Sequence, residues 1–381
     1  MDIVDRFRNL YGKSCRLYRA PGRINLIGEH TDYNDGFVMP AAINFYCWVA
    51  IAATQGRTVE VYSSNLNESR TFDLDRPQPK NDWSDYVQGV AVMLQRSGHL
   101  LHGAKMLISS EVPIGSGLSS SAALEVATGL AMLDAQNARG ECNQLALACQ
   151  RAENEFVGAR CGIMDQFAAC NGKAGHLMML DCRSLEYRFL HVPEDLRLVI
   201  CNSMVKHAIA GGEYNVRRSQ CEEGVRLLSH ARPGISALRD LTPQDFEQLR
   251  ELLPPEIRKR CRHVISENQR VHAAATALER RDLKSFGELM AESHASLRYD
   301  YEVSCRELDL LVDLANQREG VYGARMTGGG FGGCTINAVS ADAVPEFQER
   351  MASEYQRQTG IIPEIYVSTA SEGAGRWEAP A

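Results

Sequence analysis

The chain has 381 residues, 44% of them hydrophobic, and a formal net charge of −7. This length and composition predict a globular protein of two domains with packed cores. The acidic balance argues against nucleic-acid binding, which needs clustered Lys and Arg to neutralise phosphates. No stretch approaches the ~20 apolar residues of a membrane span. The twelve cysteines, scattered without a CxxC pair, fit a reducing compartment, so we expect a cytoplasmic protein with no membrane or nucleic-acid partner.

The first part of the sequence, up to about residue 115, has mostly strand-like patterns. Residues 57–62 (RTVEVY) and 105–112 (KMLISSEV) are examples. Residues 122–134 (AALEVATGLAMLD) then have the apolar spacing of an amphipathic helix, and a second helix is expected around residues 142–157.

The second part of the sequence repeats this order. Residues 176–180 and 196–202 are predicted strands, and long helices are predicted from residue 254 to about 297, where the basic run 258–262 (RKRCR) would form a solvated face. Strands followed by helices, twice over, predict an α+β protein with one domain over residues 1–190 and a second over 191–381. The last residues, SEGAGRWEAPA, are expected to form a loose tail.

Residues 113–123 (PIGSGLSSSAA) have the features of a phosphate-binding loop that opens the predicted helix. Gly115 and Gly117 allow the backbone to bend and to present its N–H groups, and a helix N-terminus adds partial positive charge. Ser119, Ser120 and Ser121 supply hydroxyls for phosphate oxygens or a metal ion. A serine N-cap would account for one of these serines only, so we interpret the whole run as a phosphate-binding loop.

Two other glycine-containing stretches fit nucleotide motifs less well. Residues 12–14 end like a Walker A loop, but Phe7 stands where that motif needs a glycine. Residues 328–333 (GGGFGG) have the spacing of a dinucleotide fingerprint but precede a strand-like run. They indicate either a tight hairpin or a backbone that lies close to a ligand. A dinucleotide oxidoreductase stays open as a second interpretation of GSGLSS, although the third glycine of that motif is missing.

Residues 22–36 (GRINLIGEHTDYNDG) bring charged groups together around a short apolar run. Arg23, Glu29, His30 and Asp32 suggest a ligand site. A metal site built from the last three would have poor geometry, because they lie within four residues on an irregular turn.

Two further carboxylates could take part in phosphoryl transfer. Asp165, in CGIMDQF, has apolar neighbours and is either a buried structural group or a catalytic carboxylate. Glu153 could help to hold Mg²⁺ through oxygen ligation, whereas nearby Glu155 fits a solvated helix face better.

These stretches together resemble the motifs of the galactokinases, a family of the GHMP small-molecule kinase superfamily. GRINLIGEHTDYNDG resembles the galactokinase signature, VPIGSGLSSSAALE the phosphate loop and RMTGGGFGGC the third motif, while CGIMDQF and GEYNVRR are similar to other family segments. The resemblance runs from about residue 19 to 375. It implies a two-domain α+β fold with the active site in the cleft between the domains, and transfer of the γ-phosphoryl group of MgATP to the anomeric hydroxyl of α-D-galactose.

The resemblance also implies roles for individual residues. Asp165 matches the catalytic carboxylate. Arg23 matches the residue that orients and polarises the reacting hydroxyl. The positions that match sugar contacts are Glu29, His30, Asp32, Gly162 and Tyr214. The positions that match phosphate and Mg²⁺ contacts are Ser120, Ser121 and Glu153, and Trp83 and Tyr86 match the adenine pocket, although an aromatic pair is more often part of a core.

Two alternatives stay open beside a galactose kinase. One is a non-catalytic sugar sensor, which the intact Ser120–Ser121 pair, Arg23 and Asp165 argue against. The other is a kinase for a different sugar, such as N-acetylgalactosamine or arabinose, because individual hydroxyl contacts decide which sugar is accepted. We expect a monomer with galactose and ATP as its small-molecule partners.

Overall fold

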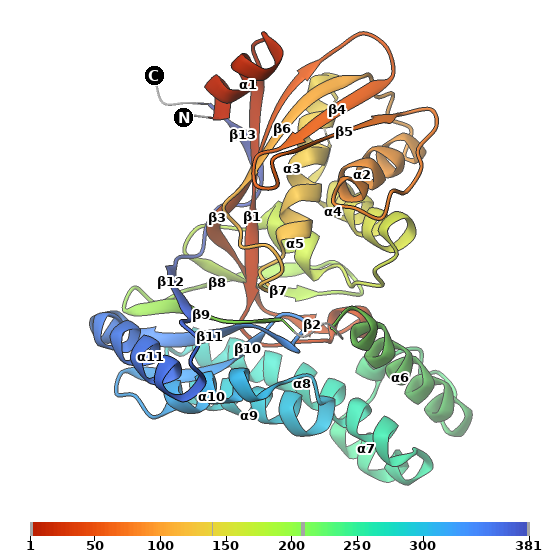
Figure 1. Cartoon of the computed structure of the whole chain (residues 1–381). Coiled ribbons are helices and arrows are strands. Elements are labelled where there is room, and N and C mark those ends of the chain that lie inside the picture. The colour runs from red at the N-terminus through yellow and green to blue at the C-terminus, as the bar shows by residue number, and fades with distance from the viewer. Residues whose placement is uncertain (1–2, 139, 207–209, 379–381) are drawn as a thin grey trace.

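The computed structural model describes residues 3–138, 140–206 and 210–378. The chain forms two α+β halves, as predicted, with most elements of the first half at the top of Figure 1 and most of the second at the bottom; β13 lies at the top beside β1, and β2 lies near the bottom. A six-stranded sheet forms the upper half, a four-stranded sheet the lower half, and a small three-stranded sheet lies between them.

The six-stranded sheet has the order β13-β1-β3-β6-β4-β5. All its neighbours are antiparallel except β4 and β6, which run parallel. In chain order its strands are β1 (Arg16–Asn25), β3 (Pro40–Ala53), β4 (Thr58–Ser63), β5 (Glu68–Asp73), β6 (Ala104–Ser110) and β13 (Gly375–Trp377).

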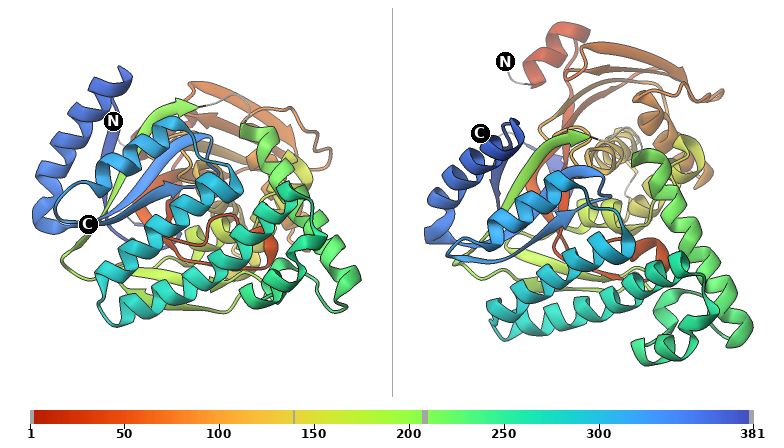
Figure 2. Two further views of the ribbon diagram at one scale, coloured as in Figure 1. Left: turned by 90° about the horizontal axis from the view of Figure 1, so that it is seen from below. Right: turned by 60° about the horizontal axis from the view of Figure 1, so that its bottom comes forward.

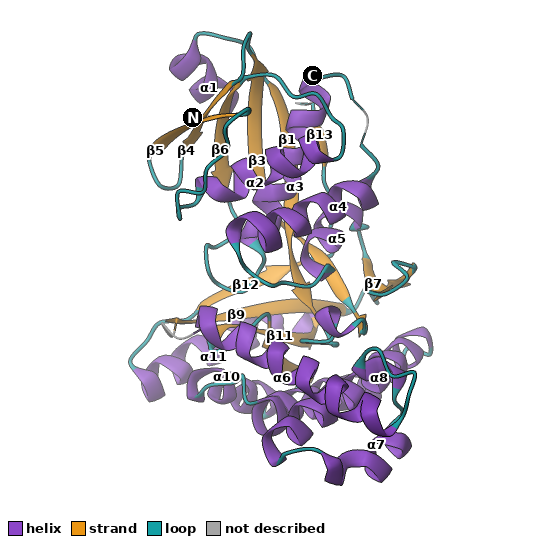
Figure 3. Ribbon diagram, turned by 90° about the vertical axis from the view of Figure 1, so that its right-hand side faces the viewer, coloured by secondary structure: helices purple, strands orange, loops and turns teal. Residues whose placement is uncertain are grey.

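Helices cover both faces of this sheet. Figure 3 shows α2 (Ser84–Arg96), α3 (Ser120–Ala135), α4 (Cys142–Arg151) and α5 (Met164–Asn171) together on one face. The other face carries α1 (Ile3–Tyr11), whose Phe7 is buried against Leu17, Ala50 and Leu107. The predicted second helix is present, but it continues beyond α4 as a π-helical segment, η2 (Ala152–Val157), which ends at Gly158.

The four-stranded sheet has the order β10-β11-β9-β12, all antiparallel. Its strands are β9 (Leu196–Lys206), β10 (Val321–Thr327), β11 (Gly332–Ser340) and β12 (Glu364–Ser368). The long helices α8 (Pro255–Glu279) and α9 (Leu283–Ser296) lie below it, as the view in Figure 2 shows. The remaining helices of this half are α6 (Ala210–Ala231), α7 (Pro243–Leu249), α10 (Arg306–Asn316) and α11 (Val344–Thr359).

The small sheet consists of β2 (Phe37–Val38), β7 (His176–Asp181) and β8 (Tyr187–His191). Short 3₁₀ or π turns complete the chain: η1 (Asp32–Asn34), η3 (Leu238–Asp240), η4 (Arg250–Leu252), η5 (Leu297–Tyr301) and η6 (Ala341–Ala343). The expected domain boundary near residue 190 falls at the end of β8, and this division of the chain stays a prediction.

The mostly strand-like character predicted for the first 115 residues is confirmed, although this part also holds two helices, α1 and α2. Two other sequence-based expectations were wrong. The last residues are not a loose tail up to residue 377, because β13 pairs with β1 and Ser371 is buried, with its hydroxyl donating to the carbonyl of Ile43. The basic run 258–262 is not uniformly solvated, because Arg260 is buried and donates to Gln220 and to the carbonyl of Asp300.

Candidate active site

The end of β1 and the start of α3 form the floor of the candidate site. The N–H of Arg23 donates to the carbonyl of Leu118 over 3.0 Å, so the loop before α3 lies directly against the strand. A Cβ on Gly22 would lie 2.6 Å from that same carbonyl oxygen, which explains the glycine at this position. Gly115, Gly117 and Ser119 all have positive φ angles, of 70°, 83° and 61°, and they form the bend that the sequence predicted.

Arg23 and Asp165 form a two-pronged ion pair in the centre of the site. Arg23 Nε donates to Asp165 Oδ1 over 2.7 Å, and Nη2 donates to Oδ2 over 2.8 Å. Arg23 Nη1 donates to the carbonyl of Gly117 over 2.7 Å, and the Ser119 hydroxyl donates to Asp165 Oδ2. Arg23 is buried and Asp165 lies in the first turn of α5. Such paired, charge-assisted bonds fix the direction in which the carboxylate points.

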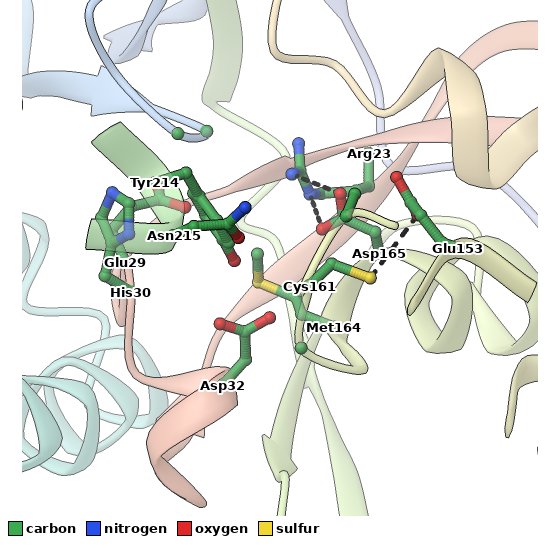
Figure 4. Close-up of a pocket in the computed structure, with 14 residues that line it drawn as sticks. Arg23, Glu29, His30, Asp32, Glu153, Cys161, Met164, Asp165, Tyr214 and Asn215 are labelled. Carbon is green, nitrogen blue, oxygen red and sulfur yellow. Dashed lines mark hydrogen bonds and ion pairs between the residues drawn. The ribbon is translucent and has the colours of Figure 1, made fainter. Parts of the chain in front are cut away.

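A cavity of about 260 Å³ opens beside this ion pair, between the two halves of the chain. All seven residues predicted for catalysis and sugar contact line it: Arg23, Asp165, Glu29, His30, Asp32, Gly162 and Tyr214 (Figure 4). The cavity is also lined by residues that the sequence had not singled out, among them Cys161, Met164 and Asn215.

Glu29 is held by a buried ion pair from the second half of the chain. Arg325 Nη2, on β10, donates to Glu29 Oε2 over 2.9 Å, and neither side chain is appreciably exposed to solvent. Burial raises the pKa of Glu29, and the nearby Arg325 and Arg23 oppose that rise. A backbone hydrogen bond from Gly328 also opposes the rise in this pKa, so the carboxylate is held from both β10 and the turn that follows it.

His30 and Asp32 lie in surroundings that a hydroxyl-rich ligand would complement. The His30 ring shares a 2.8 Å hydrogen bond between Nδ1 and the Tyr33 hydroxyl, and its buried Nε2 has no protein partner. Burial lowers the pKa of His30 well below its usual value, so the ring is neutral at pH 7. Burial and the charge of Asp165 raise the pKa of Asp32 to about 7. Among the residues that the structure describes, no group of three or more His, Cys, Asp or Glu side chains is arranged to hold a metal ion.

Position 162 lies so close to Asp32 that only a residue without a Cβ fits there. A Cβ at this position would lie 2.1 Å from Asp32 Oδ2, closer than any real contact. Because Gly162 has no side chain, the Asp32 carboxylate can occupy this part of the cavity. Tyr214, on α6, faces the same space and stacks at 5.5 Å from the His30 ring.

A second cavity, of about 340 Å³, lies on the other side of the serine loop and has mainly apolar walls. The residues predicted for the adenine pocket and part of the phosphate loop line it together: Trp83, Tyr86, Gly115, Ser120 and Ser121. Gly117 and Ser119 instead face Arg23 and Asp165. The loop thus separates an apolar cavity from a polar one.

Glu153 links the two cavities. It lines the polar cavity, and its Oε1 accepts a 3.4 Å bond from the hydroxyl of Ser121, which lines the apolar one. Gln166 Nε2 donates to Glu153 Oε2 over 2.7 Å and to the buried Glu125 over 3.0 Å. Burial, and then the charge of Asp165, raise the pKa of Glu153 to about 7. A carboxyl in this state gains stability when a cation binds, so the oxygen set of Glu153 and Ser121 fits a divalent metal ion.

Residues 328–331 form the turn between β10 and β11, and Gly332 and Gly333 begin β11, which confirms the hairpin interpretation. The turn lies against the serine loop: a Cβ on Gly328 would be 2.8 Å from the carbonyl oxygen of Gly117, and one on Gly333 would be 2.7 Å from that of Ser116. Gly328 and Gly329 also line the polar cavity. The missing side chains therefore allow two backbones to meet at the site.

Glu155 is exposed and pairs with Arg96 and Arg151 on the helix surface, as a solvated face requires. In the part of the chain that the structure describes, no helix is long and apolar enough to cross a membrane.

The fold and these paired cavities define a small-molecule kinase of the GHMP class. Models of the GHMP kinase N-terminal and C-terminal domains match residues 85–173 and 274–357. The mevalonate kinase of Methanococcus jannaschii shares the fold, with a TM-score of 0.67 at 18% identity over 94% of this chain and 99% of that one.

The chain belongs to the galactokinase family. The galactokinase galactose-binding signature matches residues 5–53. A galactokinase of Chloroflexus aggregans is 50% identical over 97% of this chain and 96% of that protein, and one of Roseiflexus is 46% identical over 98% and 96%. The crystal structure of Lactococcus lactis galactokinase complexed with galactose superposes with a TM-score of 0.95 at 37% identity, covering 98% of this chain and 99% of that one.

Proposed function

We propose that the protein transfers the γ-phosphoryl group of ATP to the anomeric hydroxyl of α-D-galactose, giving galactose 1-phosphate and ADP. The observation that carries this proposal is the Arg23–Asp165 pair, which lies where the polar cavity meets the serine loop. The galactokinase relatives and the galactose-binding signature support the choice of sugar.

In this proposal Asp165 accepts the hydrogen bond of the reacting hydroxyl. Asp165 Oδ1 has a second lone pair beside the one that Arg23 Nε occupies, whereas Oδ2 already accepts from both Arg23 and Ser119. The two bonds from Arg23 keep the carboxylate pointed toward the cavity. In a loose phosphoryl-transfer transition state the hydroxyl loses its proton late, so that orienting the attacking oxygen contributes more than the strength of the base.

The other predicted site residues divide between the two ligands. Glu29, His30, Asp32 and Tyr214 would hold the remaining hydroxyls and the sugar ring, with Gly162 making room for Asp32. Trp83 and Tyr86 would flank the adenine, and Gly115, Gly117, Ser119 and Ser120 would surround the phosphates. The cavity linings support this division for all of these residues except Gly117 and Ser119, which contact Arg23 and Asp165 instead.

Ser120, Ser121 and Glu153 would hold Mg²⁺, and the raised pKa of Glu153 supports that placement. Bound there, the ion neutralises charge on the β- and γ-phosphates of ATP. The protein is further proposed to act as a cytoplasmic monomer, without nucleic-acid or membrane partners. The free thiols of buried Cys47, Cys149 and Cys170 support a reducing compartment.

The test is an ADP-release assay with galactose, glucose, N-acetylgalactosamine and arabinose, compared through kcat/KM. We expect turnover that needs both ATP and galactose, with galactose preferred to glucose by well over tenfold. A preference below about tenfold would contradict the proposed substrate. Binding of both ligands without turnover would instead identify a sugar sensor.

A further inference from the structure

The turn that carries Glu29 and His30 has a backbone that needs external support. Gly28 has a φ angle of 94° and His30 one of 61°, so two residues in three lie in the left-handed region. For histidine this conformation is disfavoured and persists only where surrounding contacts impose it. A Cβ on Gly28 would lie 2.5 Å from the carbonyl oxygen of Phe37, so the turn is also tightly enclosed.

Glu267 on α8 holds the turn from below. Its Oε1 accepts from the N–H of Gly28 over 2.9 Å and, over a longer 3.4 Å, from the N–H of Glu29. The same oxygen accepts from the Ser293 hydroxyl over 2.6 Å, while Oε2 accepts from Arg270 Nε over 2.7 Å. Glu267 is completely buried. Burial alone would raise its pKa, but Arg270 and other nearby cations outweigh this and lower it to about 2, so the side chain is ionised at pH 7.

His263 holds the other side of Glu29. Its Nε2 lies 3.0 Å from the carbonyl oxygen of Glu29, and its Nδ1 lies 2.9 Å from the Ser296 hydroxyl. A carbonyl oxygen only accepts, so Nε2 carries the proton and Nδ1 accepts from the serine. Burial lowers the pKa of His263 to about 4, which keeps the ring neutral at pH 7.

The two contacts lie on opposite sides of one α-carbon. Glu267 binds the peptide group before Glu29, and His263 binds the peptide group after it. When both flanking peptide planes are fixed, the direction of the Cα–Cβ bond between them is fixed as well. Glu267 and His263 are not among the residues that line the polar cavity.

We propose that Glu267 and His263 are positioning residues that set galactose affinity and selectivity by fixing the direction of Glu29 and its neighbour His30. This inference rests on the proposed function, in which Glu29 and His30 contact the sugar. A displacement of about 1 Å in a positioning group can cost on the order of a hundredfold in rate. Loss of either support therefore weakens sugar binding and leaves the ATP cavity unchanged.

The test uses two substitutions that keep the shape of the side chain. Glu267→Gln retains an oxygen acceptor but removes the charge that faces Arg270. His263→Phe keeps a ring beside Tyr301, whose centroid lies 4.5 Å from that of His263, but loses the bond to Glu29. Tyr355→Phe is the matched control, because it removes one buried bond, from the Tyr355 hydroxyl to the carbonyl of Ser203 over 2.9 Å, on helix α11.

We expect each test variant to raise the KM for galactose about tenfold or more, with the KM for ATP changed less than about twofold, and to reduce the galactose-induced rise in Tm. The control should lower the Tm of the free protein without changing the KM for galactose. If His263→Phe lowers Tm to the same extent as the control and leaves the KM for galactose unchanged, the residue is structural and the inference is wrong. His263→Phe decides the question alone should Glu267→Gln fail to fold.

A fourth variant separates this inference from the proposed function. Glu29→Gln changes the predicted sugar contact itself. If it leaves the KM for galactose unchanged, the proposed role of Glu29 is wrong. If it raises that KM while both α8 variants bind galactose normally, the proposed site stands and only the positioning role is refuted.

Discussion

Replacement of Asp165 by Asn is the most direct test of the proposed mechanism. The carboxylate accepts two bonds from Arg23 and one from Ser119. In the variant an amide oxygen can still accept from Arg23 Nε, and the Ser119 hydroxyl can turn to accept from the new NH₂ group. Arg23 Nη2 then loses its acceptor, and the buried guanidinium loses its counter-charge. An unsatisfied buried donor costs about 1–3 kcal/mol of folding free energy, and more when it is charged, as Arg23 is.

The catalytic loss should be larger than the loss of stability. A positioned acid or base contributes roughly 10²–10⁴-fold to the rate, which at 1.36 kcal/mol per tenfold is about 3–5 kcal/mol of transition-state stabilisation. We expect kcat in the ADP-release assay to fall by that factor. The Kd for ATP, measured by calorimetry, should change little, because Asp165 is not among the residues that line the apolar cavity.

Ser119→Ala provides the graded comparison. It removes one of the three bonds to Asp165 and leaves the Arg23 pair intact, so its kcat should fall much less than that of Asp165→Asn. Near-normal turnover of the Asp165→Asn protein would remove this carboxylate from the mechanism, whatever the effect on Tm.

Three further predictions concern the rest of the site. Asp32→Ala should raise the KM for galactose about tenfold to a hundredfold, because a bond to a charged acceptor is worth about 1.5–3 kcal/mol; a rise in the KM for ATP alone would refute the sugar assignment. Gly162→Ala should raise the same constant by displacing the Asp32 carboxylate, and unchanged sugar kinetics would show that the carboxylate is not needed there. Glu153→Gln should raise the Mg²⁺ concentration needed for half-maximal rate without changing the KM for galactose, and an unaltered Mg²⁺ dependence would exclude Glu153 as a ligand.

The pH dependence of stability tests the state of the site carboxyls without an activity assay. The carboxyls of Asp32 and Glu153 have pKa values of about 7 in the folded protein, against ordinary values of 3.8 and 4.5. They bind more protons when folded, so their contribution to the free energy of unfolding declines as pH rises from about 4 to 7. The lowered pKa values of His30 and His263 act in the opposite direction, so the test is a comparison: between about pH 4 and 7 the Tm of ligand-free Asp32→Asn should fall less, or rise more, than that of the unsubstituted protein. If galactose binds the ionised form of Asp32, its binding should release protons from the protein. Calorimetry in two buffers detects this release.

Much of the local structure could be predicted because its signals are local. The helix after the serine loop, the strands around residues 57–62 and 196–202, and the glycine hairpin follow from apolar period and backbone chemistry. Helix α2 could not be recognised in this way. Residues 84–85 and 87–94 within it are buried, Asp85 and Gln88 among them, so the polarity of a residue in this segment does not show whether it faces solvent.

The pairings within the site had no local signal at all. Arg23 and Asp165 are 142 positions apart, and Arg325 and Glu29 are 296 apart. Only the resemblance to galactokinases suggested the first pair, and nothing in the residues around Arg325 indicated the second. The support from Glu267 and His263 was equally hidden, since both lie on the interior of a long, apparently ordinary helix.

Strand β13 has a consequence for the order in which the protein folds. The edge of β1 pairs with residues 375–377, which are synthesised after nearly all of the rest of the chain. Until then the first sheet has an open edge with unpaired backbone groups, and such edges promote association between incomplete chains. Once Trp377 has joined Trp48 and the Arg19 guanidinium between them, that edge is covered. The late strand therefore acts as a closing step of folding, and it ties the second half of the polypeptide to the first.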